Sequence, residues 1–166
     1  FENVIKGGAI SKGYVPGIEK GLHEKMEEGY LAGYPLVDIK ITLVDGKEHP
    51  VDSSEMAFKL AAKGAMEIAL SKAGCVLLEP FMKLEVFVDD EYLGAILSDL
   101  SGKRGRVLGQ EEKGHVVAVK AEVPMAELRN YAIELKSMTS GTGSFELEFD
   151  HYEILQGKLA EDVIAE

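Results

Sequence analysis

Apolar residues recur at intervals of three and four near the start of the chain, around a proline. They are Val15, Ile18, Leu22 and Met26. Charged residues occupy most positions between them, so one face of the segment is apolar and the other polar. The pattern predicts an amphipathic helix from Pro16 to Glu28, which Gly29 ends.

The pattern then switches to alternation, which predicts a half-buried strand from Leu36 to Val44. A polar loop with an Asp-Gly turn signal follows. A second helix is predicted up to about Lys72, with Asp52 as its N-cap and Glu55 completing a capping box. Small residues would let this helix pack closely on a sheet; they are Ala57, Ala61, Ala62, Gly64, Ala65 and Ala69.

Beyond Glu79-Pro80 the pattern predicts six elements. They are a strand over 82–88, a helix over 90–100, strands over 106–110 and 117–123, a helix opened by Pro124, and a strand over 145–149. The order strand–helix–strand–strand–helix–strand is that of the split βαβ or ferredoxin-like sandwich, with two helices on one face of an antiparallel sheet.

The two halves predict an α+β protein of two small domains. Residues 1–77 read as strand–helix–strand–helix, with the opening strand barely represented by Phe1 to Ile5, so we expect further strands upstream of a truncated domain. The missing initiator Met also indicates a fragment. Residues 78–155 form the second domain, and 156–166 are an acidic tail, either disordered or a frayed helix.

Composition indicates a soluble globular protein, since 46% of the residues are hydrophobic and 28% charged. We find neither a signal peptide nor an apolar run that could span a bilayer, so we expect a cytoplasmic protein without a membrane partner. Cys75 is the single cysteine, and its apolar neighbours indicate a buried thiol that only fills space in the core. The net charge of −11 argues against broad nonspecific binding of nucleic acid, so any RNA contact must be local.

The sequence lacks the usual signatures of catalysis. Glu27 stands where a zinc protease would have the second histidine after His23-Glu24, and the histidines are otherwise scattered. Gly102-Lys103 is followed by Arg104, without the hydroxyl that holds magnesium in a phosphate loop. We therefore predict no catalytic residue, no metal site and no bound cofactor in this chain.

Two loops are candidate contact surfaces. The first holds a basic cluster, Lys103, Arg104 and Arg106, in an otherwise acidic chain. It is either a solvated turn or a phosphate contact, since guanidinium groups match phosphate oxygens. The second is the polar loop from Asp45 to Pro50 with a histidine near its tip, which is either ordinary exposed surface or a functional contact.

Several strings of residues, in unbroken order, resemble elongation factor G. Each string alone is weak, and their succession up to about Glu153 is specific. Those similar to its fourth domain are Gly33-Tyr34-Pro35-Leu36-Val37-Asp38 and Asp45-Gly46-x-x-His49-x-Val51-Asp52-Ser53-Ser54-Glu55-Met56-Ala57-Phe58-Lys59. Those similar to its fifth are Leu78-Glu79-Pro80-x-Met82-Lys83, Gly102-x-Arg104-Gly105, Val123-Pro124-x-Ala126-Glu127 and His151-Tyr152-Glu153.

The resemblance implies a fourth domain with the fold of ribosomal protein S5 domain 2, here N-terminally truncated, followed by a ferredoxin-like fifth domain. It implies a monomer that contacts the ribosome, both rRNA and the tRNA–mRNA in the decoding region, during GTP-dependent translocation. GTP and Mg²⁺ would bind an N-terminal domain of the parent protein, which is a GTPase. The fourth-domain tip would comprise Asp45, Gly46, Lys47, Glu48 and His49.

The chain also departs from the family pattern. Gly46-Lys47-Glu48-His49 stands where Ser-Tyr usually precedes the histidine, so Glu48 puts an acid near RNA. Ser140-Gly141-Thr142-Gly143 replaces a common Gln-Gly-Arg-Gly and removes a cation. These changes favour a divergent paralogue that acts in ribosome recycling, conditional translocation or ribosome protection. A standalone binding module that never meets the ribosome is the alternative from another class.

Overall fold

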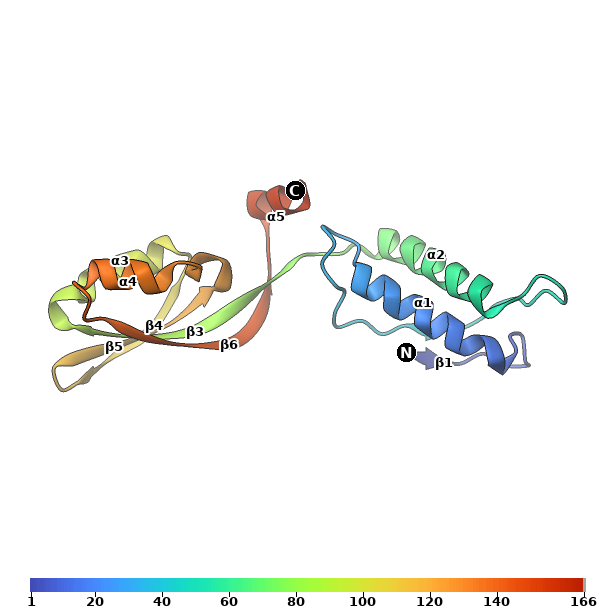
Figure 1. Ribbon diagram of the computed structural model, residues 1–166, viewed down its shortest axis with the longest axis horizontal. Coiled ribbons are helices and arrows are strands. Elements are labelled where there is room, and N and C mark those ends of the chain that lie inside the picture. Colours follow the sequence, from blue (N-terminus) through green and yellow to red (C-terminus); the bar gives the residue numbers. More distant parts are fainter. Residues whose placement is uncertain (166) are drawn as a thin grey trace. The chain divides into compact units, whose positions relative to one another are not determined.

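The computed structural model describes residues 1–165 and divides into two units (Figure 1). The first comprises Phe1–Val76 and groups with the residues from Gln156 onward; the second is Leu77–Leu155. Each unit has its own apolar core. The predicted α+β class is confirmed.

Two long helices lie side by side in the first unit (Figure 1). Its core comprises Ile10, Ile18, Leu22, Ala62, Met66 and Leu70. The elements are β1 (Glu2–Asn3), the 3-10 turn η1 (Lys12–Tyr14), α1 (Val15–Glu28), β2 (Thr42–Leu43), α2 (Glu55–Ala73) and α5 (Gly157–Ala165). The predicted first helix is confirmed to within one residue, and the predicted tail forms α5, apart from Glu166, which lies outside the described residues.

Two glycines on α1 allow the two helices to approach closely. A Cβ on Gly17 would lie 2.6 Å from the carbonyl oxygen of Glu55. One on Gly21 would lie 3.1 Å from the carbonyl carbon of Lys59 and closer still to its oxygen. The prediction that the small residues of α2 let it pack closely on a sheet is wrong: of those six residues only Ala62 is buried, and α2 packs against α1. The glycines of α1 make the contact instead.

The predicted strand from Leu36 to Val44 is largely wrong. Only Thr42 and Leu43 form β2, in parallel pairing with β1. Asp38 has φ of 54°, in the left-handed region, so the extended backbone is interrupted there. The alternation was therefore a poor guide, because a strand also needs a continuous extended backbone and a partner along its length.

The start of α2 also differs from the prediction. Ser54, rather than Asp52, is the N-cap, and its hydroxyl oxygen accepts a hydrogen bond from the backbone N–H of Ala57 at 3.0 Å. Three residues after Ser54 stands Ala57, so the predicted capping box does not form. Asp52 lies in the preceding loop.

The second unit is a four-stranded antiparallel sheet with helices on one face, in the strand order β4-β5-β3-β6 (Figure 1). Its elements are β3 (Leu78–Asp89), η2 (Asp90–Tyr92), α3 (Leu93–Gly102), β4 (Arg106–Lys113), β5 (Val116–Pro124), η3 (Met125–Leu128), α4 (Tyr131–Met138) and β6 (Ser144–Ile154). This order confirms the predicted split βαβ sandwich.

Alternate residues of the sheet face the helices and form the second core. It comprises Leu84, Val86, Val88, Ile96, Leu100, Val117, Val119, Ala121, Val123, Tyr131 and Leu135. The opposite face therefore carries the charged residues of the same strands.

Two further features of the second unit matter below. The pairing of β3 with β6 steps from Phe81↔His151 to Met82↔Phe149, so Asp150 is the extra residue of a β-bulge. The chain also enters and leaves the unit at neighbouring residues, because the N–H of Leu155 donates to the carbonyl oxygen of Leu77 at 2.9 Å.

Candidate functional site

The loop between β2 and α2 contains the predicted tip, residues 45–49. At its start, the carboxylate of Asp45 accepts a hydrogen bond from the N–H of Gly46 at 2.8 Å. Gly46 lies against the buried side chain of Ile10, and a Cβ there would overlap Cδ1 of Ile10 and come within 2.9 Å of its Cγ1. A larger residue could not take this position without displacing the loop or Ile10.

His49 is fixed by the backbone around it. Its N–H donates to Oγ of Ser53 at 2.7 Å. Its Nδ1 accepts from the N–H of Val51 at 3.3 Å and of Asp52 at 3.2 Å. An Nδ1 that accepts carries no proton, so the neutral ring carries its proton on Nε2.

Glu48 turns back toward the segment that precedes α1. Its Oε2 accepts a hydrogen bond from the N–H of Ser11 at 2.8 Å, across 37 residues of sequence. Hydrogen bonds from Ser11 hold the pKa of Glu48 below its ordinary value. Lys47, by contrast, is exposed, and within residues 1–165 no carboxylate forms an ion pair with it. The loop therefore presents the Lys47 ammonium and the His49 Nε2–H as its donors.

The predicted basic turn is held by carboxylates. The Nζ of Lys103 lies 2.6 Å from Oδ1 of Asp99 and 2.9 Å from Oε2 of Glu134. The Arg104 guanidinium donates hydrogen bonds to both carboxylate oxygens of Glu79, at 2.7 and 3.0 Å, and its Nε donates to Glu127 at 3.0 Å.

Arg106 is paired in the same way. Its Nη2 lies 2.9 Å from Oε2 of Glu122, and it also forms an ion pair with Glu153. Each cation of the turn thus faces two carboxylates. This arrangement favours the first reading of the turn, as structure, because a phosphate would have to displace acids already in place. The same ion pairs also connect three of the strings that resemble the fifth domain of elongation factor G, because Glu79, Arg104 and Glu127 each belong to a different one.

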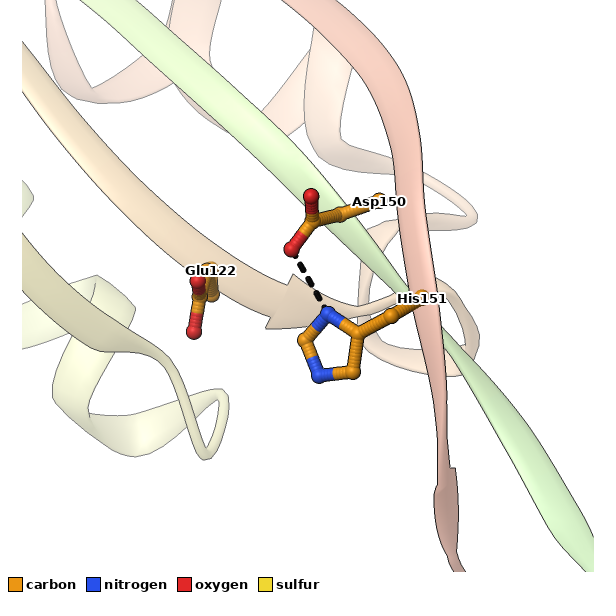
Figure 2. A group of neighbouring side chains, drawn as sticks. All are labelled: Glu122, Asp150 and His151. Atoms are coloured by element: carbon orange, nitrogen blue, oxygen red, sulfur yellow. Dashed lines mark hydrogen bonds and ion pairs between the residues drawn. The ribbon is translucent and has the colours of Figure 1, made fainter.

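A group of three side chains in the second unit, Glu122, Asp150 and His151, brings potential ligand atoms within 4.8 Å of one another (Figure 2). The bulge places Asp150 beside His151, whose Nδ1 lies 2.6 Å from Oδ2 of Asp150. Its Nε2 lies 2.7 Å from Oε1 of Glu153. Hydrogen bonds with Glu153 and then Asp150 raise the pKa of His151.

Cations of the protein already neutralise the acids of this group. Lys83 lies 3.0 Å from Asp150, and Arg106 pairs with Glu122 and Glu153. With His151 protonated, three positive side chains balance three carboxylates. A metal ion would have to displace the two permanent cations, so the geometry favours an ion-pair network.

Sequence reasoning missed both sets of ion pairs. His151 and Glu153 stood in a recognisable string, but Glu122 lies far from that string in the sequence. Only the antiparallel register of β5, β3 and β6 brings these residues together. The residues of the predicted tip are contiguous in the sequence, so a single string was enough to draw attention to them.

Comparison with known proteins gives two family matches and a solved structure of the same fold. Residues 1–74 match the model for elongation factor G domain IV, and residues 76–163 match that for the elongation factor G C-terminus. A crystal structure of a protein from Thermus thermophilus is 41% identical, with a TM-score of 0.89 over 99% of this chain. This chain spans 25% of the length of that protein. Among residues 1–165, no helix has the length and apolar character needed to cross a membrane.

Proposed function

This chain belongs to the elongation factor G family, of which it carries domain IV and the C-terminal region, and on that premise we propose that it is the ribosome-contacting part of a translational GTPase. Residues 45–49 form the tip that enters the decoding region beside tRNA and mRNA. GTP and Mg²⁺ bind elsewhere in the parent protein, since this chain has no phosphate loop.

The observation that carries this proposal is the succession of both family matches along one chain. The loop geometry supports it. The tip is anchored to Ile10 and Ser11 and presents two hydrogen-bond donors, Lys47 and His49, as contact with phosphate or base edges requires. The mechanism is steric and electrostatic: an anchored tip occupies space that tRNA leaves, and nucleotide turnover elsewhere drives its entry.

Directed hydroxyl-radical probing tests this placement. The change Lys47→Cys, in a Cys75→Ala background, positions an iron chelate at the tip, and Lys20→Cys on α1 is the matched control. With ribosomes, we expect the probe at position 47 to cleave small-subunit rRNA around the decoding region, with a different or weaker pattern from position 20. Cleavage from position 47 no greater than from the cysteine-free protein refutes the proposal.

The departures at the tip favour a divergent paralogue, acting in recycling, conditional translocation or ribosome protection, as the second candidate. Growth of a strain depleted of its main translocase distinguishes these roles. Rescue by the parent protein of this chain supports translocation, and failure to rescue, with rRNA cleavage still present, supports the paralogue.

A further inference from the structure

Glu48 poses an electrostatic problem for a loop that meets RNA. A free carboxylate beside phosphate groups would weaken binding through repulsion between like charges. In the structure Glu48 as a whole is half-buried, and its carboxylate is turned to the protein's own backbone, where Oε2 accepts from the N–H of Ser11 at 2.8 Å.

The partner of Glu48 is a backbone group at a helix start. Ser11 immediately precedes η1, the 3-10 turn of three residues that leads into α1, and the first backbone N–H groups of such a turn have no acceptor within it. The Ser11 side chain does not cap this end. The carboxylate of Glu48 therefore supplies an acceptor for the first of these N–H groups.

Two other contacts join the same two segments. Gly46 lies directly on Ile10. The hydroxyl of Tyr14 donates to the carbonyl oxygen of Ser53 at 3.4 Å. Glu48 lies between these points in sequence, next to His49, so its bond fixes the part of the loop that carries the histidine.

We infer that Glu48 is a positioning residue, which ties the tip loop to the segment before α1 and so sets the orientation of His49, and that it makes no contact with RNA itself. This rests on the proposed function for the role of His49, but the tie to Ser11 belongs to the free protein. The two parts are therefore tested separately.

The first test is amide hydrogen exchange of the full chain by NMR. In Glu48→Ala we expect the Ser11 amide to exchange roughly tenfold faster, as for loss of a hydrogen bond to a charged group, and the His49 amide to change with it. Glu48→Gln, which keeps an oxygen acceptor, has an intermediate effect. Glu27→Ala, which removes an exposed carboxylate from α1, leaves Ser11 unchanged. Unchanged Ser11 exchange in Glu48→Ala overturns the inference.

The second test is ribosome affinity of Glu48→Ala and Glu48→Lys. A positioning residue predicts weaker binding for both, because both lose the tie to Ser11. A residue that faces RNA predicts the opposite: affinity rises from Glu to Ala to Lys as repulsion is replaced by attraction. That rise overturns the inference. If the unaltered chain in its parent protein does not bind ribosomes, the proposed function fails, while the exchange result still decides the tie.

Discussion

Replacing Gly21 by alanine tests the close approach of α1 and α2. The added Cβ would meet the backbone of Lys59, 3.1 Å from its carbonyl carbon and closer to the oxygen. Backbone cannot swing aside as a flexible side chain can, so the helices must separate locally. The ion pair between Lys59 and Glu24, at 2.6 Å, joins the helices at the same level and would be disturbed as well.

The expected magnitude follows from two opposing effects. Overpacking of a well-packed contact costs about 1–3 kcal/mol. Alanine is a better helix former than glycine by about 1 kcal/mol, which offsets part of that cost. Because the clash is between two backbones, we expect the upper part of the range to apply, and a net loss of about 1–2 kcal/mol.

Gly64 on α2 is the matched control. It is exposed, and a Cβ there would meet nothing within 4 Å. Gly64→Ala therefore gains only helix propensity and stabilises α2 by about 0.5–1 kcal/mol. The same chemical change is thus predicted to have opposite signs at two helical positions of one unit.

Hydrogen exchange read by mass spectrometry on peptides of α1 and α2 measures both changes in the full chain. We expect exchange to be roughly 5–30-fold faster in Gly21→Ala and about 2–5-fold slower in Gly64→Ala. Slower exchange in both variants would mean that propensity alone governs these helices, which refutes the packing argument.

Three further predictions concern the caps and ion pairs. Arg104→Ala leaves the carboxylate of Glu79, whose side chain is only 12% exposed, without its bidentate partner; we expect a loss of about 1–2 kcal/mol after allowance for solvent screening. Arg104→Lys should recover only part of it, as thermal unfolding of the second unit will show. Ser54→Ala should destabilise α2 by about 1 kcal/mol, whereas Asp52→Ala should have little effect; equal effects in exchange or urea unfolding would restore Asp52 as the cap. The raised pKa of His151 means that its stabilising contribution is present below the unfolded pKa, about 6.5, and is lost as pH rises through the folded pKa. Calorimetry across this range should show a decline in Tm that is absent from His151→Gln.

The sequence was a reliable guide where one segment carries the whole signal. The first helix was predicted almost to the residue, because its apolar period, Pro16 and Gly29 all lie within α1 or at its end. The ferredoxin-like order was predicted for a similar reason, since β3 and β5 alternate over their own lengths, whereas β4, exposed throughout, was predicted from the turn before it. The polar loop over 45–50 was likewise predicted from one contiguous segment, and it lies between β2 and α2; its role as a tip stays a prediction.

Predictions failed where the outcome depends on the local backbone geometry or on a distant partner. The alternation over 36–44 could not reveal that Asp38 adopts a left-handed conformation. Ser54 and Asp52 are both good caps by residue type, and only the geometry of the incoming loop decides between them. Arg104 looked like a free cation because its acids, Glu79 and Glu127, lie far from it in the sequence on both sides.

The hydrogen bond between Leu155 and Leu77 brings the two ends of the second unit together. Because these ends are adjacent, we expect that the unit can be deleted by linking Val76 to Gln156. We also expect that it can be expressed alone, with its two termini close together. The same closeness suits it to circular permutation, with new ends opened at an exposed hairpin such as the one around Gly114.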